Sequence, residues 1–94
     1  SGGAIGRTWG RCGELQQLWV EPALRGGGIG RALVCAFEAR ARERGCTTFY
    51  LETFSFQAPM LYEALGYRIA LTIDGYAPGI EKFVMVKRAD EPAR

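Results

Sequence analysis

The sequence predicts an α/β (α+β) fold, with a mixed, mostly antiparallel sheet around a central parallel β-α-β unit. A strand-like segment at residues 15–20 leads through a glycine-rich turn into a helical pattern that begins at residue 28 or 29 and ends at residue 44. A second β-branched and aromatic segment, residues 47–54, follows this helix, and the strand-helix-strand order favours parallel pairing. The last two strand-like segments are joined by turn residues, which favours an antiparallel pair.

Composition and charge limit the class of protein. The 94 residues suffice for one small domain, and a hydrophobic content of 48% suits a globular core. A net charge of +2 predicts no nucleic-acid partner and no membrane surface, and no apolar run reaches the roughly 20 residues of a membrane span. No signal peptide is visible. The three cysteines lack C-x-x-C spacing and histidine is absent, so we expect no metal and reduced thiols in a cytoplasmic protein.

The N-terminal third is expected to contain two strands. Residues 1–9 form a weak strand, and residues 10–13 form a turn that includes Cys12. The alternation of residues 15–20 is imperfect, which predicts burial on both faces of that strand. Glu21-Pro22 ends the strand, because proline cannot donate a hydrogen bond to a neighbouring strand.

The helix that follows is expected to be amphipathic. Gly45 is placed to cap its C-terminus. Its predicted apolar stripe consists of Ile29, Leu33, Phe37 and Ala41, with Ala32 and Ala36 beside them.

The C-terminal half is expected to add a short helix and two strands to the strand at residues 47–54. The helix covers residues 58–65 and the strands cover residues 67–73 and 82–87. Asp-Gly and Pro-Gly pairs mark the loop between those strands. We expect one domain over residues 1–88 and a flexible tail over residues 89–94.

The glycine-rich turn predicts an anion site. In Gly26-Gly27-Gly28-Ile29-Gly30, small residues let backbone N–H groups approach a ligand, and the unpaired N–H groups of the first helical turn favour phosphate. A Walker A loop is excluded, because Arg31-Ala32 stands where that loop needs lysine and serine or threonine. A dinucleotide loop matches in part, with Leu33 in place of its third glycine and Glu52 near the position of a ribose-binding acid.

A third interpretation is an acyl-CoA loop. Arg25-x-x-Gly28-x-Gly30 resembles the R/Q-x-x-G-x-G/A signature of the GNAT family of N-acetyltransferases. The stretch LWVEPALRGGGIGRALV looks like that family's fourth strand, turn, pyrophosphate loop and third helix. Ala58-x-x-Leu61-Tyr62-Glu63-x-Leu65-Gly66-Tyr67 looks like its A-x-x-x-Y-x-x-x-G-F/Y segment, and LETFSFQAP resembles a bacterial subgroup.

The resemblance implies an acetyl-CoA-dependent N-acyltransferase that moves an acetyl group to a primary amine by direct attack. It implies that Tyr62 protonates the departing CoA thiolate. Ser55 stands where many members have an asparagine that bonds the pantetheine arm, and Gln57 could substitute for it. The implied binding residues are Leu18, Trp19 and Val20 for pantetheine, and Arg25, Gly26, Gly27, Gly28, Ile29, Gly30 and Arg31 for pyrophosphate.

A general base must take the proton of the acceptor amine. Glu52 leads the candidates because it is the single charge in a hydrophobic strand, where desolvation favours the protonated carboxyl group, and Glu21 and Glu14 follow. No cysteine is obviously placed to form an acyl-enzyme. Aromatic residues that could line an acceptor pocket are Trp9, Trp19 and Phe56.

The resemblance also implies a gap. GNAT domains begin with a strand, two helices and another strand, and this chain has no room for the first strand and the two helices, which usually form one wall of the acceptor site. We therefore expect either a fragment or a homodimer in which the partner completes the site. The alternative function is a non-catalytic CoA or small-molecule binding protein, and the acceptor, a small-molecule or peptide amine, stays open.

Overall fold

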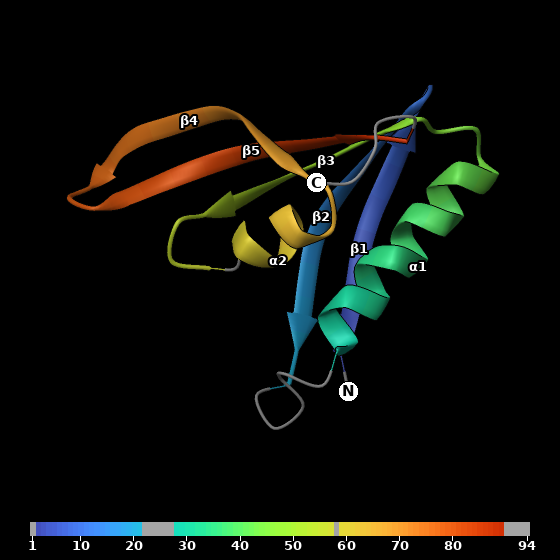
Figure 1. The fold of residues 1–94 in the computed structure, drawn as a ribbon, viewed down its shortest axis with the longest axis horizontal. Helices are drawn as coiled ribbons and strands as arrows, with labels where there is room; N and C mark the ends of the chain where they lie inside the picture. The colour runs from blue at the N-terminus through green and yellow to red at the C-terminus, as the bar shows by residue number, and fades with distance from the viewer. Residues whose placement is uncertain (1, 22–27, 58, 90–94) are drawn as a thin grey trace.

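The computed structural model describes residues 2–21, 28–57 and 59–89 (Figure 1). The loop residues Arg25, Gly26 and Gly27, the expected helix start at Ala58 and most of the expected tail lie outside the described residues. Along the chain the elements are β1 (Gly2–Trp9), β2 (Cys12–Val20), α1 (Ile29–Glu43), β3 (Thr48–Phe54), α2 (Pro59–Ala64), β4 (Arg68–Ala77) and β5 (Ile80–Arg88).

The strands form a single mixed sheet in the order β1-β2-β3-β5-β4. β2 and β3 are parallel and enclose α1 in the sequence, whereas the β1–β2, β3–β5 and β4–β5 pairs are antiparallel. The predicted mixed sheet around a parallel β-α-β unit is therefore confirmed.

β2 and β3 separate halfway along their length. They pair from Cys12 with Thr48 to Leu15 with Leu51, and beyond Leu15 and Leu51 they diverge (Figure 1). α2 lies at this opening between the two strands (Figure 1).

A β-bulge in β2 accompanies the separation. Ile5 of β1 lies opposite Gln17 and Gly6 lies opposite Leu15, which leaves Gln16 as an extra residue. The bulge reverses the alternation, so Leu15 before it and Leu18 after it both pack toward the core. The expected burial on both faces of this strand is wrong, because Gln16, Gln17 and Trp19 are exposed and the irregular pattern marks a bulge.

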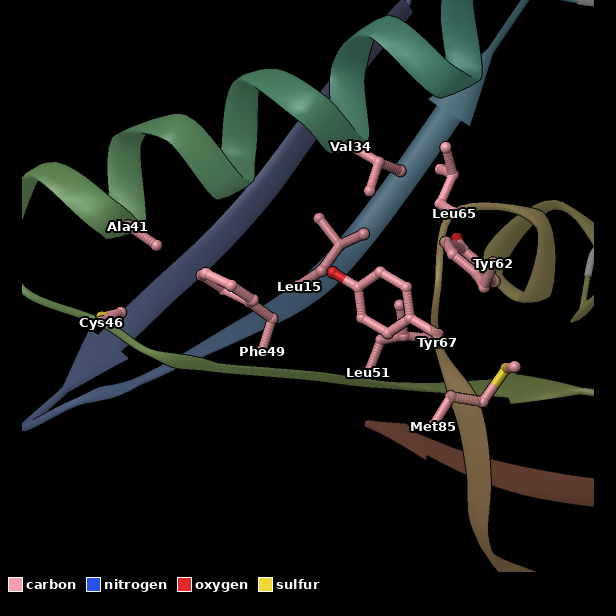
Figure 2. Packing of buried hydrophobic residues seen from close by; sticks show 10 residues of the cluster. All are labelled: Leu15, Val34, Ala41, Cys46, Phe49, Leu51, Tyr62, Leu65, Tyr67 and Met85. Atoms are coloured by element: carbon pink, nitrogen blue, oxygen red, sulfur yellow. The ribbon is translucent and has the colours of Figure 1, made fainter. Parts of the chain in front are cut away.

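Both helices pack on one face of the sheet and enclose the core (Figure 2). Phe49, Leu51 and Met85 supply its best-buried sheet side chains. The predicted stripe of α1 is partly wrong, because Ala32 and Ala36 are exposed while Val34 and Glu38 are buried. The full core cluster is Leu15, Val34, Ala41, Cys46, Phe49, Leu51, Tyr62, Leu65, Tyr67 and Met85.

No helix of the described residues covers the other face of the sheet. Large apolar side chains are exposed there, among them Trp9, Trp19, Leu71 and Ile73. β1 forms one edge of the sheet and β4 the other. We call this uncovered surface the bare face. Within the described ranges, no helix is long and apolar enough to cross a membrane.

Two predicted turns are shorter than expected. Only Gly10 and Arg11 form the first turn, so that Cys12 already belongs to β2. β4 runs on to Ala77 through an irregular register, which leaves the Pro78-Gly79 pair as the turn. The predicted cap at Gly45 is confirmed, since this residue has a φ of 88° and its N–H bonds the Arg42 carbonyl.

Candidate active site

A cavity of about 290 Å³ opens where β2 and β3 separate. Because neighbouring strand residues point to opposite sides of a sheet, Glu52 faces the bare face while the buried Leu51 faces the helices. Tyr62 approaches the cavity from the helix side, so the cleft joins the two faces of the sheet. Its lining consists of Leu15, Gln16, Gln17 and Leu18 of β2, Leu51 and Glu52 of β3, Gln57 and Tyr62.

The cleft side of β2 presents backbone groups rather than another strand. Beyond Leu15 no described strand pairs with β2 on this side, although β1 pairs with its other side as far as Val20. Such an edge can bond an extended ligand arm as if the arm were an added strand. Leu18 lines the cavity, while Trp19, about half exposed, is outside its lining.

The N-terminus of α1 is chemically open. Gly28 is the N-cap in the left-handed conformation, with a φ of 83°, and provides no side-chain cap. The first N–H bonded within the helix is that of Ala32, which donates to the Gly28 carbonyl at 3.0 Å. The N–H groups of Ile29, Gly30 and Arg31 therefore have no acceptor within the helix, and the helix dipole makes this end attractive to an anion.

α2 adjoins this helix terminus. A Cβ atom on Gly30 would lie 3.4 Å from Cδ2 of Leu61, so the first turn of α1 packs close to α2. Tyr62 follows Leu61 in the chain and lines the cleft. The open helix terminus, α2 and the cleft are thus parts of one region.

Tyr62 is the buried titratable side chain of the cleft. It is 8% exposed, and burial raises the pKa of its phenol above the ordinary value. The phenol therefore stays protonated at neutral pH. No described residue hydrogen-bonds its hydroxyl, so the group is available as a proton donor to a ligand in the cavity.

The three candidate carboxylates lie in different places. Glu52 lines the cavity, but the burial expected of it is wrong, because its side chain is 48% exposed and pairs with Lys82 at 3.1 Å. Glu14 pairs with Arg7 at 2.8 Å and is outside the cavity lining. Glu21 is exposed just after β2. Only Glu52 of these three carboxylates is brought to the cleft.

Ser55 and Gln57 also differ in position. The Ser55 hydroxyl accepts the Glu81 N–H at 3.0 Å, and the Ser55 N–H donates to the Glu81 carbonyl at 2.8 Å. These bonds hold Ser55 at the end of the β3–β5 pair, outside the cavity lining. Gln57 lines the cavity, and its Oε1 accepts hydrogen bonds from the Phe54 N–H at 2.8 Å and the Thr53 hydroxyl at 3.3 Å. This arrangement turns its amide NH₂ group toward other partners.

The aromatic candidates lie outside the cavity lining. Trp9 is 88% exposed at the end of β1. Phe56 stacks on Phe54 with ring centroids 5.4 Å apart and is mostly exposed. No cysteine lines the cavity, and the described residues contain no group of three or more histidine, cysteine or acidic side chains that could hold a metal ion.

Sequence reasoning missed Glu38. It lies on α1 and is 3% exposed, although the predicted apolar stripe of this helix did not include it. The Tyr67 hydroxyl donates to its Oε2 at 2.9 Å, and Lys87 donates to its Oε1 at 2.9 Å. The available signal was its spacing of four residues from Val34, which is fully buried on the same side of the helix.

The model of the Acetyltransferase (GNAT) family matches residues 2–67. Blasticidin-S acetyltransferase of Streptomyces morookaense is 42% identical over 88 residues, which cover 93% of this chain and 65% of that protein. IAA acetyltransferase of Azospirillum brasilense is 37% identical over 73 residues, covering 76% of this chain and 48% of that protein.

The crystal structure of an acetyltransferase from Bacillus cereus superposes with a TM-score of 0.87 at 33% identity, covering 93% of this chain and 62% of that one. The chain thus spans less than two thirds of the length of each of these relatives. The family match extends over most of the chain and includes the separated strands, the open helix terminus and Tyr62. This chain belongs to the GNAT family of acetyltransferases.

Proposed function

We propose that this chain is an N-acetyltransferase that binds acetyl-CoA in the cleft between β2 and β3 and transfers the acetyl group to a primary amine. The observation that carries the proposal is a protonated, buried phenol, that of Tyr62, on a cavity that joins both faces of the sheet. Acetyl-CoA would enter from the helix side and the amine from the bare face.

The binding half of the proposal follows from backbone groups. The pantetheine arm pairs with the edge of β2 along Leu18, Trp19 and Val20, and the Gln57 amide group donates to it in place of Ser55. The pyrophosphate sits on the N–H groups at the start of α1, where Arg31 adds a positive charge. Arg25, Gly26 and Gly27, which lie outside the described residues, complete this site by family resemblance.

The chemical half is direct attack. The amine nitrogen attacks the thioester carbonyl carbon, a C–N bond forms, and the carbonyl π electrons move to oxygen. Backbone N–H groups at the Gln16–Gln17 bulge stabilise this oxyanion. When the C=O bond re-forms, the C–S bond breaks and the CoA sulfur takes the proton of Tyr62. The amide and CoA thiol are the products, and a base takes the proton lost by the amine.

We assign the general base to Glu52, because it is the candidate carboxylate that lines the cavity. It also lies on the side of the sheet from which the amine would enter. It acts directly or through water. Glu21 and Glu14 are the lesser candidates. Glu52→Gln should lower kcat about a hundredfold while KM for acetyl-CoA stays unchanged, and an unchanged kcat would exclude this assignment.

The competing proposal is a non-catalytic CoA-binding protein. It is favoured by the Ser55 bonds to Glu81, which withdraw that side chain from the pantetheine arm. Tyr62→Phe separates the two functions, since it removes the hydroxyl and keeps the ring. Loss of turnover with acetyl-CoA binding retained supports catalysis, whereas a wild type that binds CoA and acetylates no amine supports the binding protein.

The first experiment is calorimetric titration of the chain with acetyl-CoA, desulfo-CoA and NAD. Saturable binding of acetyl-CoA without a signal from NAD is expected. Because a relative is a blasticidin-S acetyltransferase, blasticidin S is the first amine to test for acetylation. Absence of acetyl-CoA binding by a folded sample would contradict the proposed cleft.

We also propose that a second copy covers part of the bare face and the unpaired edge of β1, which together expose large apolar side chains. Sedimentation equilibrium should give the mass of a homodimer. A monomer at all concentrations would exclude this assembly.

A further inference from the structure

α2 carries Tyr62 but is too short to be stable alone. It has six residues, far fewer than an isolated helix needs in water. Its C-terminal end closes on the Tyr62 carbonyl, which accepts the N–H groups of both Leu65 and Tyr67 at 3.0 Å. The position of Tyr62 is therefore set by what holds the chain just after α2.

Tyr67 is a direct packing partner of Tyr62. Its ring meets the Tyr62 ring edge-on, with centroids 6.0 Å apart and planes at 72°. Figure 2 shows the two rings beside each other, with the Tyr67 hydroxyl turned away from Tyr62. That hydroxyl donates to Oε2 of Glu38 at 2.9 Å.

Glu38 belongs to α1 and is itself fixed. Lys87 of β5 donates to its Oε1 at 2.9 Å, and Arg42, one helical turn on, lies 3.6 Å from the same oxygen. The hydrogen bond from the Tyr67 hydroxyl to the Glu38 carboxylate has a charged acceptor. Because both side chains are buried, this bond is stronger than the same bond would be on an exposed surface.

We propose that Glu38 is a positioning residue, which holds Tyr62 at the cleft by binding the hydroxyl of Tyr67, whose ring packs against the Tyr62 ring. The inference rests on the proposed function, in which Tyr62 is the general acid. α1 then has two tasks: its N-terminus receives the CoA pyrophosphate, and Glu38 in its middle orients the group that protonates the CoA sulfur.

The test is a double-mutant cycle on kcat. Tyr67→Phe keeps the ring and removes the hydrogen bond to Glu38. It should lower kcat about tenfold to a hundredfold, the cost of a small misplacement of a catalytic group, with KM for acetyl-CoA unchanged. In a Tyr62→Phe background the same change should lower the remaining kcat less than twofold, because the acid is already absent. Equal losses in both backgrounds would mean a merely structural role and would overturn the proposal.

Tyr50→Phe is the matched control. Tyr50 is a sheet tyrosine whose pKa is raised by burial and by the neighbouring Glu14 charge, and it lies outside the cleft lining. It should leave kcat and KM within twofold of the wild type. A loss equal to that of Tyr67→Phe would show that removing any tyrosine hydroxyl beside a glutamate has this effect, and would overturn the proposal.

A second readout needs no turnover. In the chain labelled with ¹³Cζ-tyrosine, the Tyr62 signal is identified by its disappearance in Tyr62→Phe. Tyr67→Phe and Glu38→Gln should shift or split this signal, and Tyr50→Phe should not. An unmoved Tyr62 signal in both variants overturns the proposal. A moved signal in a chain that acetylates no amine keeps the positioning role and instead contradicts the proposed function.

Discussion

Replacing Lys87 by methionine tests how much the buried Glu38 charge depends on its partners. The Glu38 side chain is 4% exposed, and the Lys87 ammonium lies 2.9 Å from it. Methionine keeps the apolar stem of lysine and removes the charge. The Glu38 carboxylate is then left with the Tyr67 hydroxyl and with Arg42, whose 3.6 Å separation is too long for a good hydrogen bond.

The magnitude follows from burial. Removing one partner of a fully buried pair costs about 3 to 5 kcal/mol. Because Lys87 is 19% exposed and Arg42 remains nearby, we expect a smaller loss than this, about 2 to 3 kcal/mol. For a domain of this size, that loss lowers Tm by about 8 to 24 °C.

Lys82→Met is the matched control. Lys82 lies on the same strand and reaches Oε1 of Glu52 at 3.1 Å, but the Glu52 side chain is 48% exposed. Exposed pairs contribute about 0 to 1 kcal/mol, so this variant should cost about 1 kcal/mol or less.

Urea unfolding followed by circular dichroism at neutral pH gives both free energies of unfolding. If the two lysine variants differ by less than about 0.5 kcal/mol, burial of Glu38 does not set the strength of its ion pair, and the reasoning fails.

Three further predictions concern a backbone turn, the core and pH. Gly28→Ala should cost about 1 kcal/mol of stability, because φ is 83° at this position and an alanine there is strained. Gly30→Ala should be neutral or stabilising in the same urea unfolding experiment, because Gly30 lies inside α1 and a Cβ atom there makes only ordinary contact with Leu61. Leu51→Ala should cost about 2 to 5 kcal/mol because Leu51 is 1% exposed, and Leu71→Ala, at 54% exposure, should cost less than 1 kcal/mol by thermal unfolding. Burial and the neighbouring Glu38 raise the pKa of Tyr67, so above a pH of about 10 the unfolded chain releases a proton that the folded chain retains. Stability is therefore unaffected below that pH and falls by about 1.4 kcal/mol per pH unit above it, and a Tyr67→Phe variant whose unfolding shows the same alkaline slope would contradict this account.

The sequence alone determined the order of the elements and the parallel β-α-β unit. These features depend on neighbouring residues: β-branched and aromatic segments form strands, glycines end helices, and a strand-helix-strand order requires a crossover. The start of α1 next to Gly28 and the placing of Tyr62 on a short helix were predictable for the same reason. The resemblance to the GNAT family also depended on local motifs.

Several errors came from treating each strand or helix by itself. The irregular alternation of β2 was interpreted as burial on both faces, yet it reflects the bulge at Gln16, which requires a second strand to define it. Glu52 was expected to be desolvated because its neighbours in sequence are apolar. Its neighbour in space is Lys82 on β5, and the face of the sheet to which it points is bare.

Only the tertiary structure decided the cleft and the Glu38 cluster. The cleft exists because pairing of β2 and β3 stops after Leu15 and Leu51. The local sequence pattern of a single strand does not predict where it separates from its neighbour. Glu38 bonds residues 29 and 49 positions away, so its partners could not be inferred from the helix that carries it. Hydrophobic periodicity records which side of an element faces inward, whereas the partners that stabilise a buried charge are fixed only when distant strands and helices pack together.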